Sequence, residues 1–161
     1  MNLLAINKSS VIGSNLIHPS PFFLKFLSVL LIVFFGFSIS ANADVVSQRK
    51  AGFKANAASM KAIASAIGGG DYQTVINQAK TISNWAQKIP SYFPKGSGFG
   101  DTKARAEIWA NFDDFTGLSK ANETAANRLV TAAKSGDPGA MMASLKNLGI
   151  SCTACHRSYK N

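Results

Sequence analysis

The pentapeptide Cys152-Thr153-Ala154-Cys155-His156, close to the C-terminus, restricts the fold of this chain more than any other feature. Residues three and four apart share one face of an α-helix, so both thiols and the imidazole can address the same surface. Two cysteines at this spacing, followed directly by histidine, are typical of haem c attachment, in which the thiols bond to the porphyrin vinyl groups and the histidine ligates iron. The chain must therefore fold so that one helix face lies against a large, flat cofactor.

Other uses of two cysteines and a histidine fit the sequence less well. A structural zinc site needs four ligands, and this cluster offers three. A thioredoxin-like dithiol is expected after a strand in an alternating strand and helix pattern, which the chain lacks. A pair of buried or disulfide-bonded cysteines beside a structural histidine is the remaining alternative. Haem attachment is the favoured interpretation.

Residues 1–43 have the pattern of a secretory signal peptide. They contain no acidic residue, Lys25 precedes an apolar run over 26–37, and Ala41-Asn42-Ala43 follows the run. A basic flank, a short apolar segment and a small-x-small ending predict cleavage before Asp44. An uncleaved membrane anchor is the alternative, but the run falls short of the ~20 residues that span a bilayer. We therefore expect no stable membrane anchor after cleavage.

Residues 44–161 are predicted to form one domain. His18 would be removed with the signal peptide, which makes His156 the only histidine of that domain. The domain stays basic, with 15 Lys and Arg (17 less Lys8 and Lys25) against 8 Asp and Glu. A basic surface can attract an acidic redox partner or an anionic membrane, although charges spread over solvated helices are the more common explanation. No cluster of basic and aromatic residues indicates nucleic-acid binding, and export predicts a periplasmic location.

The domain has the periodicity of four helices and no alternation typical of strands. The first helix is predicted over about 45–67 and ends at three glycines; the second begins at an Asp71 N-cap and ends before Pro90. Residues 90–103 are predicted to form a loop that packs against the domain, and 104–111 a short turn or helix. A third helix ends at Gly136, and Asp137-Pro138 predicts the start of a fourth.

Apolar residues recur at steps of three and four along each helix, which predicts four inward faces. These faces are Phe53, Met60, Ala64 and Ile67; Val75, Ala79, Ile82, Ala86 and Ile89; Phe115, Leu118, Ala125, Leu129 and Ala132; and Met141, Leu145, Leu148, Cys152, Cys155 and Tyr159. Asn122 also falls on the third face, which is unusual for a polar residue. Since the two cysteines lie on a buried face, the sequence predicts an all-α, antiparallel four-helix bundle that encloses one haem c.

Three groups of residues make the chain resemble a known family. They are the C-terminal CxxCH sequence, a first helix that contains Arg49-Lys50-Ala51-Gly52-Phe53-Lys54 and Met60-Lys61-Ala62-Ile63, and a central Glu107-Ile108-Trp109 followed by Phe112 and Phe115. Together they resemble the class II c-type cytochromes, the cytochrome c′ family, over essentially all of residues 44–161. The resemblance implies a four-helix bundle with one haem c, often a homodimer, in the bacterial periplasm.

That family divides at one position of the first helix, four residues after the arginine. Low-spin electron carriers have a methionine there, which ligates the iron opposite the histidine. This chain has Phe53, and a phenyl ring cannot coordinate iron. The resemblance therefore implies a high-spin, five-coordinate iron with His156 as axial ligand, which binds small uncharged gases such as nitric oxide or carbon monoxide. Packing as an ordinary core aromatic is compatible with this role of Phe53.

Met60 is the alternative sixth ligand. It lies two turns from Phe53 on the same face, ~10 Å further along the helix. That distance favours a place in the pocket wall, where methionine commonly packs.

The remaining pocket residues follow from spacing together with the resemblance. Arg49 lies one turn before Phe53 on the buried face, where its charge needs a partner; a haem propionate is the partner that the family suggests, and reaching solvent is the alternative. Lys160 follows His156 by four residues and is expected on the proximal side, or simply near the helix C-terminus. Trp109 and Tyr159 are expected to pack near the haem.

Three functions fit this sequence. The first is a gas-binding, five-coordinate cytochrome, and the second is a low-spin electron carrier of the same fold with Met60 or another group as sixth ligand. The third is an enzyme that turns over nitric oxide or peroxide at an open iron. The third is the weakest, because no distal histidine or arginine pair and no acid–base pair stands out, so we expect no enzymatic activity.

Overall fold

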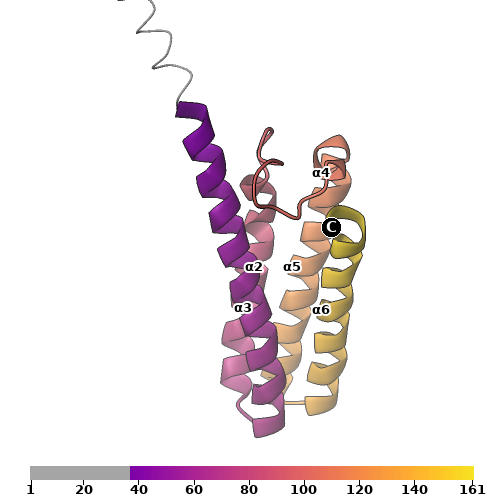
Figure 1. Cartoon of the computed structure of the whole chain (residues 1–161). Helices are drawn as coiled ribbons and strands as arrows, with labels where there is room; N and C mark the ends of the chain where they lie inside the picture. The colour runs from indigo at the N-terminus through magenta and orange to yellow at the C-terminus, as the bar shows by residue number, and fades with distance from the viewer. Residues whose placement is uncertain (1–36) are drawn as a thin grey trace, which may run out of the picture. The chain divides into compact units, whose positions relative to one another are not determined.

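The structure, a computed structural model, describes residues 37–161, with side chains from residue 44 onward. The predicted signal peptide therefore lies almost entirely outside the described residues. Residues Ser38–Asn161 form one compact unit, which contains four long helices and two short ones (Figure 1). The helices are α2 (Phe37–Gly69), α3 (Tyr72–Lys88), the 3₁₀ helix η1 (Ile89–Tyr92), α4 (Glu107–Ala110), α5 (Phe112–Ser135) and α6 (Pro138–Tyr159).

Local signals set the start of α3, the end of α5 and the start of α6 where the sequence predicted them. The Asp71 carboxylate accepts a hydrogen bond from the Thr74 amide and caps α3, and the Asp137 carboxylate caps α6 through the amides of Gly139 and Ala140. Gly136 ends α5 in the left-handed conformation, at φ 73°. Short connections between α2 and α3 and between α5 and α6 make each pair antiparallel, so the predicted four-helix bundle is confirmed.

The first long helix differs from its prediction in two ways. It begins at Phe37 instead of about residue 45. Its inward face also contains Ile63 and Ala66, whereas Ala64 is exposed. The step from Met60 is three residues and not four at this point, because the larger Ile63 side chain takes the central position in the core.

The core has an aliphatic part and an aromatic part. The aliphatic part joins α2, α3, α5 and α6 through residues such as Ile63, Val75, Leu129 and Leu148. The aromatic part lies near η1 and α4, and its buried members are Ala86, Ile89, Phe93, Ile108, Phe115 and Tyr159. The predicted inward faces of α3 and α6 are buried or half-buried throughout.

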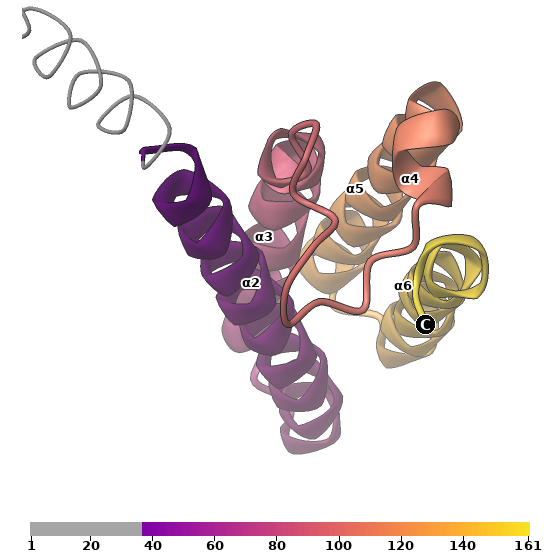
Figure 2. The same cartoon turned by 45° about the horizontal axis from the view of Figure 1, so that its top comes forward.

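The long connection between η1 and α4 follows the prediction only in part. It runs as a loop across one end of the bundle, between α2 and α6 (Figure 2). Phe93 at its start is 5% exposed, whereas Phe99 is 83% exposed. The loop therefore packs against the bundle at Phe93 and at Ser97, which is fully buried, and projects at Phe99. Within residues 37–161, no helix combines the length and apolar character that crossing a bilayer requires.

Candidate haem site

A cavity of about 930 Å³ opens between α2, α6 and the loop that connects η1 to α4. Figure 2 shows α2 and α6 on two sides of this region, with α3 and α5 behind them. Eight of the nine residues that the sequence assigned to the site line the cavity. They are Arg49, Phe53, Met60, Cys152, Cys155, His156, Tyr159 and Lys160.

Helix α6 supplies the attachment residues from its last turns. Both cysteines are free thiols and half-buried against the cavity. Burial raises the pKa of Cys152, and burial together with the nearby Cys152 raises the pKa of Cys155 to about 11. At neutral pH both thiols are therefore protonated, and neither is spent in a disulfide.

His156 lines the same cavity, and the residue as a whole is exposed. Burial of the ring, followed by the positive charge of Lys160, lowers the pKa of His156. Both effects favour the neutral imidazole, the form that coordinates metals. The backbone of Lys160 closes α6 by donating to the His156 carbonyl and pairs with Ala104 of the loop in an antiparallel bridge. The loop is thus attached to the end of α6.

Helix α2 supplies the opposite side of the cavity. The Phe53 ring packs edge-on against Trp85, with centroids 5.5 Å apart, and contacts Phe93 at 6.5 Å. These neighbours hold the ring in place. Met60 is half-buried and packs against the aliphatic core.

Trp109 does not line the cavity, in contrast to its expected place in the pocket. Its indole N–H donates to the carbonyls of Phe93 and Pro94, at 3.1 and 3.0 Å. Its ring lies against Phe93, which does line the cavity, and so close to Gly98 that a side chain there would overlap it. The loop carbonyls therefore hold Trp109 one layer behind the cavity wall.

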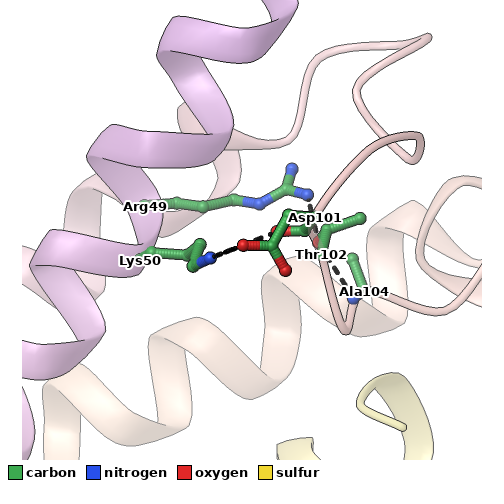
Figure 3. A network of polar contacts seen from close by, with 5 residues as sticks. All are labelled: Arg49, Lys50, Asp101, Thr102 and Ala104. Atoms are coloured by element: carbon green, nitrogen blue, oxygen red, sulfur yellow. Dashed lines mark hydrogen bonds and ion pairs between the residues drawn. The ribbon is translucent and has the colours of Figure 1, made fainter.

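Arg49 is 2% exposed and engaged by the loop (Figure 3). Its guanidinium donates to Ser97 Oγ at 3.1 Å, Ser97 O at 2.9 Å and Thr102 Oγ1 at 2.5 Å, and lies 4.6 Å from the Phe93 ring centroid. None of the ion pairs in the described part of the chain includes Arg49. Its charge is thus buried beside the cavity with neutral partners only, and burial lowers its pKa.

A second contact fixes the same loop from outside. Lys50, the neighbour of Arg49 on α2, forms an ion pair with the carboxylate of Asp101 (Figure 3). Thr102 accepts from the Ala104 amide as well as from Arg49. Two consecutive residues of α2 therefore hold two consecutive residues of the loop at the cavity rim.

Asn56 and Asn122 are among the polar residues of the cavity that sequence reasoning did not assign to the site. Asn56 lines the cavity between Phe53 and Met60, and the recurring steps of four and three along α2 pass through it. Asn122, the unexpected polar residue on α5, is 6% exposed and donates to Ser151 and Cys152. Its place on an inward face is therefore explained by partners on α6.

The residues present fit a covalently held haem. The site combines two unpaired thiols and a neutral imidazole on one helix with a mostly apolar cavity beside them. It also holds a buried guanidinium without a carboxylate partner in the described part of the chain, which suits an acidic haem substituent. No group of three or more His, Cys, Asp or Glu within the described residues is placed to bind a metal ion on its own.

Comparison with known proteins decides the family. The family model described as cytochrome C′ matches residues 44–160. The chain belongs to the cytochrome c′ family. It is 37% identical over 123 residues to cytochrome c′ of Rhodospirillum rubrum, which covers 73% of this chain and 82% of the relative. It is also 37% identical to cytochrome c-556 of Agrobacterium tumefaciens (strain II Chrys), over 73% of this chain and 98% of the relative.

Solved structures of the cytochrome c′ family share the fold. Cytochrome c prime of Shewanella frigidimarina superposes with a TM-score of 0.68 and 30% identity, over 74% of this chain and 96% of that protein. Membership of the family makes this chain a c-type cytochrome whose cofactor is one covalently bound haem c. The pair Cys152 and Cys155 fits the attachment sequence.

Proposed function

We propose that this cytochrome c′ family member holds its haem iron with His156 as the single protein ligand and binds small gases, such as nitric oxide or carbon monoxide, on the α2 side. One observation carries the proposal: Phe53 occupies the α2 side of the cavity, where its ring is fixed by Trp85 and Phe93. A phenyl group has no lone pair to donate to iron. The same haem can pass electrons to a partner protein.

An exchange at Phe53 tests this proposal. Phe53→Met places a thioether on the α2 side and should convert the haem-loaded protein from a high-spin to a low-spin absorption spectrum. Ala58→Met is the matched control, because Ala58 is exposed on the same helix and does not line the cavity, so it should leave the spectrum high-spin. A spectrum that Phe53→Met leaves unchanged would mean that Phe53 does not face the iron.

Met60 carries the second candidate function, a low-spin electron carrier. It lines the cavity, as Phe53 does, but lies seven residues further along α2, a rise of ~10 Å. We therefore expect Met60→Leu to leave the spin state unchanged. Conversion of a low-spin protein to high spin by this substitution would favour Met60 ligation and contradict the open site.

The lining of the cavity also supports binding and electron transfer over peroxide turnover. His156 is the cavity's one histidine within the described residues, and the terminal nitrogens of Arg49 already donate to the loop. The described lining thus offers no distal histidine and no free arginine to assist cleavage of a bound peroxide, and we expect no peroxidase activity above that of free haem.

Export to the periplasm is the last part of the proposal. Residues 1–43 have the signal-peptide pattern, and the family match begins at residue 44. Export also fits the chemistry, because the two cysteine thiols must meet the haem outside the cytoplasm to form thioether bonds. N-terminal sequencing of the periplasmic protein should start at Asp44. Sedimentation of the same sample would test the homodimer that the resemblance implies.

A further inference from the structure

The carboxamide of Asn56 stands out among the polar groups of the cavity. Asn56 lies on α2, three residues after Phe53 and four before Met60, so all three share one helix face and line the cavity. Its Oδ1 atom is buried and has no hydrogen-bond partner, a condition that only one other side-chain atom of the described residues shares, Trp85 Nε1. A buried amide oxygen without a hydrogen-bond partner is destabilising, because it has lost its bonds to water and gained none in return.

The other hydroxyl and carboxamide side chains in the cavity wall have protein partners. Ser119 Oγ donates to the Ala86 carbonyl at 2.6 Å, Asn122 donates to α6, and Thr102 bonds to Arg49 and the loop backbone. These groups serve to join the elements of the bundle. Asn56 lines the same wall, but its Oδ1 atom is buried and bonds to no other group of the described residues.

We propose that the Asn56 carboxamide is the hydrogen-bonding group for a small molecule bound on the α2 side of the cavity, and that it favours polar or anionic ligands over carbon monoxide. This inference rests on the proposed function, because it requires an open coordination position facing α2. A carboxamide offers two N–H donors and one acceptor oxygen, and rotation about its last bond presents either side. It can therefore donate to the terminal atom of a bound anion or accept from bound water.

The Asn56 hydrogen bond should raise the affinity for polar or anionic ligands only. Phe53 and Met60 on either side of Asn56 offer only apolar surface, so a weakly polar ligand gains little from this wall. A hydrogen bond to a charged group contributes about 1.5–3 kcal/mol, and even the lower figure corresponds to about tenfold in affinity. The Asn56 side chain is thus expected to strengthen the binding of cyanide and to leave the affinity for carbon monoxide nearly unchanged.

The test uses the haem-loaded protein and two probes, cyanide for the ferric state and carbon monoxide for the ferrous state. Asn56→Leu should weaken cyanide binding about tenfold and change carbon monoxide affinity less than twofold. Asn84→Leu is the matched control, since Asn84 is exposed on the neighbouring helix α3 and does not line the cavity. It should change neither affinity.

A second variant and a spectroscopic measurement separate the loss of the carboxamide from any disturbance that the leucine side chain causes in the cavity wall. Asn56→Ala removes the carboxamide without adding bulk and favours the helix; it should weaken cyanide in the same way. In both variants the C–O stretching band of the ferrous complex should move to higher wavenumber as the N–H donor is lost. Cyanide affinity equal to that of the unmodified protein in both variants would overturn the inference while leaving the open site intact. Failure of the unmodified protein to bind either probe would overturn the proposed function and, with it, this inference.

Discussion

The side-chain amide of Asn122 on α5 lies 3.4 Å from the sulfur of Cys152 on α6 and donates a hydrogen bond to it. The same nitrogen donates to Ser151 Oγ at 2.9 Å. Asn122 is 6% exposed, so these bonds are made away from bulk water. A polar residue on an apolar face therefore joins the two helices beside Cys152, which fits the haem attachment sequence.

We expect Asn122→Ala to lower the free energy of unfolding of the haem-loaded protein by about 1–2 kcal/mol, because Ser151 loses a buried partner and a small cavity forms. Urea unfolding measures the change. Asn127→Ala, at an exposed position of the same helix, should stay within about 0.5 kcal/mol of the unmodified protein. Equal losses in the two variants would show that the Asn122 contacts contribute nothing.

Gly52 is expected to be the glycine of α2 that tolerates no side chain. A Cβ atom built on it would lie 2.2 Å from the Trp85 ring, which is itself held between Phe53 and Tyr92. Overpacking of this kind costs about 1–3 kcal/mol, more than the roughly 0.5–1 kcal/mol that alanine contributes to a helix. Gly52→Ala should therefore destabilise the protein in thermal unfolding.

At Gly117 the same substitution, glycine to alanine, is expected to have the opposite effect on stability. It lies within α5 and nothing approaches the position of its missing Cβ within 4 Å. Gly117→Ala should stabilise the protein by about 0.5–1 kcal/mol. If Gly52→Ala also stabilised the protein, the close approach of Trp85 to α2 would be wrong.

Arg49→Lys should loosen the loop at the cavity rim. A lysine retains the charge but cannot donate to Ser97 and Thr102 together from a planar fork, so we expect a loss of about 1–3 kcal/mol. Faster chymotrypsin cleavage near Phe93 and Phe99 would report the loosening. Arg128→Lys, exposed on α5, is the control; loop cleavage that is no faster in Arg49→Lys than in this control would contradict the assigned contacts.

The hydroxyl of Tyr159 should lose its proton at a higher pH than an ordinary tyrosine does. Its hydroxyl donates to Asp114 Oδ2 at 2.6 Å, and this bond, with burial, raises the pKa of Tyr159 to about 12. Because the folded-state pKa exceeds that of unfolded tyrosine (~10), the stabilisation is present below pH ~10 and is lost as the pH rises through about 12.

The measurement is the alkaline absorbance titration of the unmodified protein minus that of Tyr159→Phe. The difference curve should have its midpoint near pH 12. Tyr159→Phe should also be about 1 kcal/mol less stable at neutral pH, from the lost hydrogen bond. A difference curve centred near pH 10 would show that Asp114 does not hold the hydroxyl.

Features set by local sequence were the ones that could be predicted. The carboxylates of Asp71 and Asp137 cap helices within three residues of themselves, and the spacing from Met141 to Tyr159 identified the buried face of α6. The attachment residues lie together on that one face, so neighbouring positions alone were enough to place them beside a cavity.

Features set by distant parts of the chain could not be predicted. Arg49 meets Ser97 and Thr102 across about fifty residues of sequence, and no helical period connects a helix to the interior of a loop. Trp109 was expected at the cavity, but two loop carbonyls hold it one layer back. Asn56 was missed because it is polar, although the steps of four and three pass through it.

The spectrum of the ferrous haem-loaded protein tests the central claim most directly, that His156 is the iron's single protein ligand and Phe53 faces it across the cavity. We predict a high-spin spectrum with a broad, unsplit α-band region that changes on addition of carbon monoxide. A sharp, split α band that carbon monoxide leaves unchanged would contradict the claim, because it would mean that a second protein group already occupies the sixth position.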